Sequence, residues 1–234
     1  MLLRERYFEE PESETLELAT AAFQKAIDTL IAVQQERRRS GQSQQLHFSL
    51  DLAKYRNNLA VALLTGLQKL DDVEQQKHLD LAEREVAAAV DICESLNVGT
   101  REVRVELAGF YNTRAYVVSK QQSGDAVTDW KKAADVLETV WEQNKSDSVA
   151  TEKLALIRCN ICDHYMKRGS HDEALSSIEH LSKLSCGDAR YEKAATLMQT
   201  GHDMALPMDK ALAERYRVSR DQFASQNGTK RSAE

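Results

Sequence analysis

The chain has very little glycine and proline. Its 234 residues include 9 Gly and 2 Pro, well under half of the roughly 12% share that these residues have in an average protein. Barrels, sandwiches and doubly wound sheets need a turn about every dozen residues and use Gly and Pro to make many of them. The composition therefore argues against such folds and favours long helices with few interruptions.

The sequence also lacks a long apolar run, a secretory start and a strong charge of one sign. Its longest apolar stretch, residues 59–64, is far short of the ~18 residues that a membrane span needs. The start, MLLRERYFEE, has no apolar signal-peptide core, because charge begins at Arg4. With 31 Lys plus Arg and 37 Asp plus Glu, the net charge is −6, which argues against a general role on nucleic acid or membrane surfaces. We predict a cytoplasmic protein that binds neither nucleic acid nor membranes.

The four cysteines, Cys93, Cys159, Cys162 and Cys186, show no spacing of a disulfide framework. We predict reduced and mostly buried thiols. Two of them, Cys159 and Cys162, share a helix face in the way that zinc ligands do. However, His164 falls on a different face and no second Cys pair follows. The prediction is therefore no metal and no cofactor.

No sequence motif supports catalysis. There is no Glu-x-x-His pair of a di-iron bundle, no glycine-rich phosphate loop and no Gly-x-Ser-x-Gly nucleophile elbow. His171-x-Glu173 matches a fragment of the zinc-deaminase signature, but the Pro-Cys-x-x-Cys part that should follow is missing. We predict that the protein is not an enzyme and name no catalytic residue.

Apolar residues recur at helical spacing almost throughout, and strand-like alternation is hard to find. Asp71 with Glu74, and Ser170 with Glu173, have the form of capping boxes that open helices. We predict nine helices, over residues 13–39, 46–70, 71–96, 101–121, 125–144, 147–168, 170–184, 188–205 and 207–226. The predicted organisation is an N-terminal segment (1–12), a helical repeat domain (13–205), a C-terminal capping helix (206–226) and a disordered tail (227–234).

A stripe of small and large apolar residues recurs on alternate helices. A small residue, a large one four positions on and a further small one three positions later let a neighbouring helix approach closely. The four copies are Ala19-x3-Phe23-x2-Ala26, Ala82-x3-Val86-x2-Ala89, Ala126-x3-Trp130-x2-Ala133 and, with leucine in the last place, Ala174-x3-Ile178-x2-Leu181.

The helices that precede these copies also match one another. The matching segments are Arg56-Asn57-Asn58-Leu59-Ala60, Tyr111-Asn112-Thr113-Arg114-Ala115 and Arg158-Cys159-Asn160-Ile161-Cys162, followed three residues later by Leu63, Val118 and Tyr165. This pairing resembles the tetratricopeptide repeat (TPR), and CDHYMKRGSHDEALSSIEHL is its best copy. The resemblance implies an all-α fold of antiparallel helix-pair repeats, a TPR-like α-solenoid of about nine helices.

The sequence departs from the TPR pattern in its spacing. Successive copies begin at Ala19, Ala82, Ala126 and Ala174, further apart than the 34 residues of the family. The first helix resembles the second member of a pair without its first. This start implies either one region of a longer protein or an irregular N-terminal cap.

Two further resemblances are weaker. YRNNLA and GFYNTRA are similar to repeat arrays attached to bacterial serine/threonine kinases of eukaryotic type. The helix count is similar to that of the 14-3-3 adaptors, but the basic-pocket motif of that family is absent.

In a TPR-like array the first helix of each pair lines the concave side. The resemblance therefore implies a peptide-binding groove, in which side-chain amides could hydrogen-bond an extended main chain. Its predicted residues are Lys54, Asn57, Val61, Leu64, Asn112, Tyr116, Ser119, Lys120, Cys159, Asp163, Met166 and Lys167.

The function predicted from this groove is a non-catalytic scaffold or adaptor that binds a peptide or protein segment. The resemblance to kinase-linked arrays implies that it is the interaction module of a larger bacterial signalling protein. Two alternatives stay open at this point. One is a homodimerising structural module, and the other is a helical domain that binds a small ligand between its helices.

Overall fold

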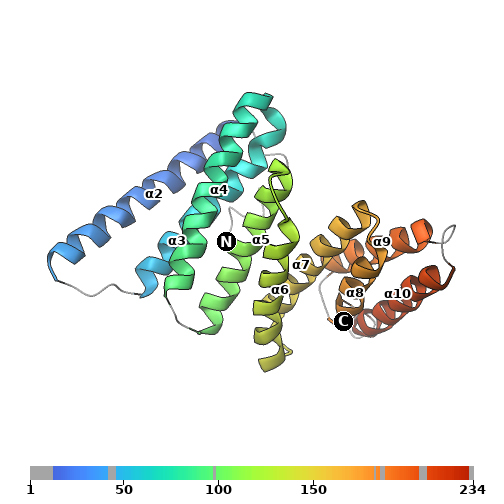
Figure 1. The fold of residues 1–234 in the computed structure, drawn as a ribbon. Coiled ribbons are helices and arrows are strands. Elements are labelled where there is room, and N and C mark those ends of the chain that lie inside the picture. The colour runs from blue at the N-terminus through green and yellow to red at the C-terminus, as the bar shows by residue number, and fades with distance from the viewer. Residues whose placement is uncertain are drawn as a thin grey trace. The chain divides into compact units, whose positions relative to one another are not determined.

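A computed structural model describes residues 13–41, 46–96, 99–181, 183–184, 188–205 and 210–231. These residues form nine α-helices and one short 3-10 helix, and no strand occurs among them (Figure 1). The predicted all-α class is confirmed. No helix in this part of the chain is long and apolar enough to cross a membrane.

The chain divides into two compact units, Met1–Ala126 and Val127–Glu234. Unit 1 contains α2 (Ser13–Arg39), α3 (Leu46–Gly66), the 3-10 helix η1 (Leu67–Lys69), α4 (Asp72–Ser95) and α5 (Arg101–Gln121). Unit 2 contains α6 (Ala126–Gln143, with Ala126 closing unit 1), α7 (Ser148–Lys167), α8 (His171–Leu181), α9 (Asp188–Ala205) and α10 (Lys210–Arg231).

Helices pack against their neighbours in the chain and against the next helix but one. In unit 1, α2 contacts α3, α3 contacts α4, α4 contacts α5, and α3 also contacts α5. In unit 2, α7, α8, α9 and α10 contact one another in succession, α7 also contacts α9, and α8 also contacts α10. This packing is typical of a helical repeat, in which each helix pair is stacked on the next.

Local signals in the sequence set the helix ends. The Asp71 carboxylate accepts hydrogen bonds from the backbone N–H groups of Val73 (3.0 Å) and Glu74 (2.9 Å) at the start of α4. This confirms the predicted cap at Asp71. At the other end of a helix, Gly169 follows α7 with φ +71°, and the backbone N–H of Ser170 donates to the carbonyl of Tyr165 (2.9 Å). Glycine suits this left-handed C-terminal turn because it has no Cβ to clash.

The recurring stripes form the core. Every stripe residue of α4, α6 and α8 is at most 4% exposed. The small residues of the preceding helices, Ala60, Ala115 and Cys162, are completely buried. The α2 copy differs, because Ala19, Phe23 and Ala26 are only half-buried.

Three helix ends differ from the prediction. Regular α-helix ends at Gly66 before η1, and α8 ends at Leu181, where the last bonds have turn geometry. Helix α10 continues to Arg231, so residues 227–231, predicted as tail, are helical. The sequence there contains Asn and Gly, which lower helix propensity by about 1 kcal/mol at most, but no Pro, which would end the helix. The predicted helix start at Pro207, the N-terminal segment 1–12 and residues 232–234 lie outside the described residues.

Candidate protein-interaction face

The solvent-facing side of α3 is a narrow stripe, because α2, α4 and α5 all contact this helix. Val61 is 41% exposed and Tyr55 is 38% exposed. Lys54 and Asn58 are half-buried along the same side, and Leu64 is half-buried at the edge of the stripe, one turn after the buried Ala60. The ring of Tyr55 lies 6.5 Å from that of Phe23 on α2. Tyr55 therefore lies on the α2 side of the stripe.

Helix α5 continues the stripe. Lys54 Nζ lies 3.0 Å from Glu102 Oε1 and 4.0 Å from Glu106 Oε1, which ties α3 to the first turns of α5. Partial burial lowers the pKa of Lys54, but the hydrogen bond to Glu102 and the nearby carboxylate charges outweigh this effect, and the net pKa is raised. Lys54 is thus held as a cation between the two helices.

Further along α5, Tyr116 is 43% exposed. The ammonium of Lys120 lies 5.4 Å from the centre of its ring, in the range of a cation–π contact. Ser119 is exposed and Asn112 is half-buried. We refer to these two stripes together as the α3–α5 face, which consists of Lys54, Asn58, Val61, Leu64, Asn112, Tyr116, Ser119 and Lys120.

Three predicted groove residues do not face solvent. Asn57 is 6% exposed, Met166 is 5% exposed and Cys159 is completely buried. Asn57 lies on the same side of α3 as Ala53 and Ala60, which are both fully buried. Met166 contacts Cys162, with 3.5 Å between the two sulfurs. The groove prediction is wrong for these three residues. Helical spacing shows which residues share a side of a helix, but not which side packs against the core.

Asn58 was missed, although its spacing could have identified it. It lies four residues after Lys54 and three before Val61, so the three share one side of α3. The predicted amide on this face is therefore present, one position further along than Asn57.

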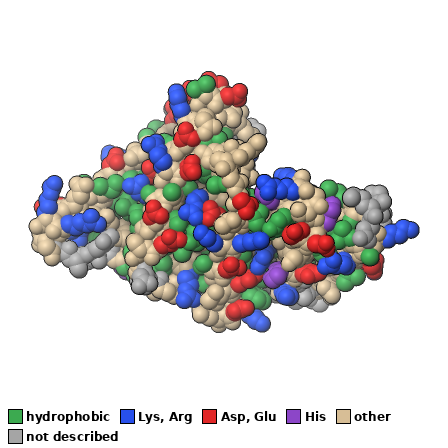
Figure 2. Space-filling view, viewed as in Figure 1, with side chains coloured by type: hydrophobic (Ala, Val, Ile, Leu, Met, Phe, Trp, Pro, Cys, Tyr) green, Lys and Arg blue, Asp and Glu red, His purple; other side chains and the backbone are tan. Residues whose placement is uncertain are grey.

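Asp163 and Lys167 belong to α7 in unit 2. Lys167 is exposed and Asp163 is half-buried, and the two form an ion pair one turn apart, with 2.7 Å between Lys167 Nζ and Asp163 Oδ2. They are not part of the α3–α5 face. Figure 2 shows acidic and basic side chains interspersed over the visible surface, and this pair is a typical solvated element of such a surface.

The cysteines lie inside the helical packing. Cys93, Cys159 and Cys162 are free and buried, and Cys186 lies outside the described residues. Burial raises the pKa of Cys93 to about 11 and that of Cys162 to about 12. The imidazole of His164 packs edge-on against Trp130, 5.6 Å between ring centres. Among the residues described, no group of three or more His, Cys, Asp or Glu side chains is placed to hold a metal ion.

A contact between successive repeats was also missed. The Tyr111 hydroxyl donates to Glu94 on α4, and the Arg158 guanidinium donates to Glu138 on α6. Tyr111 and Arg158 are equivalent in the repeat alignment, and Glu94 and Glu138 have the same offset from Ala82 and Ala126. This shared offset in the sequence could have predicted the contact.

The first repeat lacks this contact, because Ile31 occupies the corresponding position of α2. The equivalent arginine, Arg56, instead donates to Glu85 on α4 (2.6 Å). The side chains that join successive helices thus follow the repeat alignment, and they change where the alignment places an apolar residue.

Comparison with known proteins adds little. No family model matches the chain, and no curated protein matches it. A solved structure described as "DHF119 filament" is similar over 90% of this chain and 95% of that one, with 15% sequence identity and a TM-score of 0.27. A likeness this weak carries no argument about fold or function.

Proposed function

We propose that this protein is a non-catalytic interaction scaffold, a TPR-like array that binds a peptide or protein segment on the α3–α5 face. The observation that carries the proposal is the exposure of Val61 and Tyr116, 41% and 43%, on two helices that contact each other. Single exposed apolar residues are common on any protein. Two on adjacent helices, with half-buried Leu64 beside them, give a partner a place to bury an apolar anchor.

Polar groups around these anchors support recognition of a polypeptide. The amides of Asn58 and Asn112 can both donate and accept, which suits the N–H and C=O groups of a main chain. The Lys54 ion pairs hold the first turns of α3 and α5 together, so the face is in place before a partner arrives. A surface of this kind loses less entropy on binding than a mobile one.

The charges on the face give the bound segment a direction. Glu102 and Glu106 lie at the start of α5, whereas Lys120 lies in its last turn. A bound segment would therefore place a basic group near the start of α5 and an acidic group near Lys120. By the resemblance to kinase-linked arrays, the segment would belong to a bacterial signalling partner.

Site-specific crosslinking tests the proposal. A photoreactive phenylalanine analogue replaces Val61 or Tyr116 in the full chain, and the crosslinked proteins are identified from native extract. Val73, which is 65% exposed on α4, is the matched control. We expect positions 61 and 116 to capture one common protein and position 73 to miss it.

Competition then shows whether the contact is specific. A peptide from the captured protein should bind with a micromolar Kd, and Val61→Lys should weaken it at least tenfold. Equal capture at position 73, or unchanged affinity of Val61→Lys, would refute the proposal. Capture of the chain itself would favour the homodimer, and a large thermal shift with one metabolite would favour a ligand-binding domain.

A further inference from the structure

Helix α2 carries an apolar face that the described part of the chain covers incompletely. Leu18 is 65% exposed and Val33 is 37% exposed. Between them, the side chains of Ala19, Phe23, Ala26 and Leu30 are only half-buried. Ile27 is the one described residue of this helix that is fully buried. We refer to Leu18, Ala19, Ala22, Phe23, Ala26, Leu30 and Val33 as the α2 face.

The repeats within the chain show what covers such a face elsewhere. The equivalent residues of α4, Ala82, Val86 and Ala89, are completely buried, as are those of α8. Each of these helices contacts the helix that precedes it, α3 for α4 and α7 for α8. The covering helix is in both cases buried along most of its length and carries a buried small residue, Ala60 in α3 and Cys162 in α7. No described helix occupies this place against α2.

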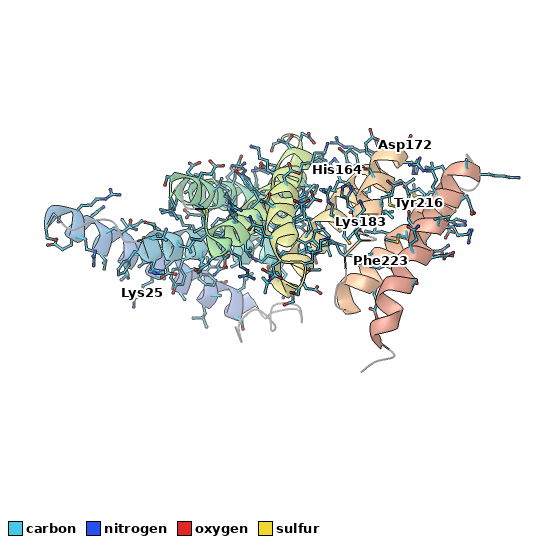
Figure 3. All side chains as sticks on the ribbon, turned by 90° about the horizontal axis from the view of Figure 1, so that it is seen from below. Lys25, His164, Asp172, Lys183, Tyr216 and Phe223 are labelled. Atoms are coloured by element: carbon cyan, nitrogen blue, oxygen red, sulfur yellow. The ribbon has the colours of Figure 1, made fainter. Side chains whose placement is uncertain are left out.

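Helix α10 covers its two large aromatic residues more completely than α2 covers Phe23, although Val218 on its outer side is 41% exposed. Its apolar residues Tyr216 and Phe223 point into the packing with α8 and α9 and are completely buried (Figure 3). On its exposed side, Arg217 bridges Glu214 (2.5 Å) and Asp221 (2.9 Å). A polar outer surface is what the end of a helical repeat requires in water. Helix α2 instead presents leucine, valine and alanine.

We propose that the α2 face is a docking site for an amphipathic α-helix of a partner protein. The docked helix would run antiparallel to α2, as the first helix of a pair does, with apolar residues at i, i+3, i+4 and i+7. A small residue of the partner would face Phe23, since only close approach of two helices lets the alanines of the stripe be covered. With 27 residues, α2 is about 40 Å long at 1.5 Å per residue, long enough for a partner helix of several turns.

The exposed ammonium of Lys25 (labelled in Figure 3) gives the site a charge preference. It lies three residues after Ala22 and four before Thr29, on the outer edge of the α2 face. An acidic residue on the partner helix, on the side next to Lys25, would pair with it. This surface is separate from the α3–α5 face, and the two proposals can fail independently.

The test uses a defined helical probe and the full chain. The probe is a fluorescent peptide with the α3 sequence, residues 46–66, stapled between the exposed positions 61 and 65 so that it is helical in solution and keeps Asp51. Fluorescence anisotropy should show saturable binding with a micromolar Kd. Ala26→Glu, in the middle of the stripe, should weaken binding at least tenfold, whereas Gln35→Glu, on the exposed polar side of the same helix, should leave it unchanged. A probe with Ala60→Glu should fail to bind.

The remaining outcomes each decide the proposal. No saturation with the wild-type chain, or equal effects of Ala26→Glu and Gln35→Glu in variants with unchanged circular dichroism, would overturn it. A concentration-dependent dimer in sedimentation that Ala26→Glu abolishes would assign the face to a second copy instead. Probe binding only after removal of residues 1–12 would assign it to the start of this chain. Val61→Lys should bind the probe like wild type, which separates this result from the proposed function.

Discussion

The two units each contain a place where a glycine lets two helices touch, and the two places differ in rigidity. In unit 1, a Cβ added at Gly66 of α3 would lie 2.3 Å from Cδ2 of Leu16 on α2. In unit 2, a Cβ at Gly201 of α9 would lie 2.3 Å from Cε1 of Tyr216 on α10. Leu16 is half-buried and presents the tip of a flexible side chain. Tyr216 is completely buried, and its hydroxyl donates to the carbonyl of His171 (3.2 Å).

This difference shows that one repeat pattern can build two kinds of terminal helix. Helix α10 is fixed by an aromatic ring with a hydrogen bond and by full burial of Tyr216 and Phe223, although Val218 on its outer side is 41% exposed. Helix α2 is attached along one side and keeps apolar surface in contact with water. A fixed end stabilises the array, whereas a partly covered one leaves room for a partner helix.

The largest expected effect comes from removing an aromatic side chain from each terminal helix. Phe223→Ala should lower the free energy of unfolding by about 3–5 kcal/mol, because the ring is completely buried and leaves a cavity. Phe23→Ala should cost about 1–2 kcal/mol, since its ring is half-exposed and less transfer free energy is lost. Urea titrations followed by circular dichroism measure both.

Tryptophan fluorescence separates the units in the same titrations. Both tryptophans, Trp130 and Trp141, lie in α6, so fluorescence reports on unit 2. Phe223→Ala should move the fluorescence transition strongly. Equal losses for the two alanine variants would contradict the contrast between the terminal helices.

The two glycines give the next largest effect. Gly201→Ala should destabilise the protein by about 1–3 kcal/mol, the usual cost of overpacking a core, because the Tyr216 ring has no free space to move into. Gly66→Ala should be nearly neutral, since Leu16 can turn away and alanine gains roughly 1 kcal/mol of helix propensity over glycine. Thermal melts of the two variants measure the difference. A larger loss for Gly66→Ala would mean that α2 is the more firmly held helix.

The N-caps of one helix in each unit give a smaller expected difference in stability. Asp147 is 7% exposed and accepts from the backbone N–H of Ala150 (3.0 Å), whereas Asp71 is exposed. Asp147→Ala should cost about 2 kcal/mol and Asp71→Ala about 1 kcal/mol, within the range known for N-caps. The reason is that water replaces the lost acceptor at Asp71 more easily than at the buried Asp147. Asparagine at either position should restore most of the stability, and urea midpoints of the four variants test this order.

A structural feature could be predicted from the sequence where local residue spacing determines it, and could not where the packing of neighbouring helices determines it. Caps and breakers act locally, so the cap at Asp71 and the helix end at Gly169 were predictable. The stripes of α4, α6 and α8 were predictable because small residues at fixed offsets let a neighbouring helix approach closely. The side of a helix that faces water was not predictable. Asn57 and Asn58 differ by one position, and Asn57 is buried because α3 packs against three neighbouring helices.

The exposure of the stripe residues of α2 could not be predicted from the sequence pattern either. Its residues match those of α4, and burial depends on a neighbouring helix rather than on the residues themselves. The same limit applies to the α3–α5 face, since Val61 and Tyr116 could be placed on a helix side from spacing, but their exposure could not.

Thiol titration gives the smallest effect and compares the two units by pH. Burial raises the pKa of Cys93 in unit 1 to about 11 and that of Cys162 in unit 2 to about 12, whereas an unfolded thiol titrates near 8.5. Below about pH 8.5 both states keep the proton and stability is constant. Above it the unfolded chain loses the proton first, so the folded state becomes less stable as pH rises toward 11.

The expected loss is at most about 1 kcal/mol per thiol between pH 9 and 10, because one pKa unit corresponds to 1.36 kcal/mol. Urea midpoints at pH 9 and pH 10 measure the loss for the wild type, Cys93→Ala and Cys162→Ala. Each variant should lose less stability on going to pH 10 than the wild type does, since one thiol no longer titrates. The benefit should persist to higher pH for Cys162→Ala, because the folded thiol in unit 2 resists ionisation longest. A wild-type loss that neither variant reduces would show that other groups cause it and that burial does not separate the thiols of the two units from solvent.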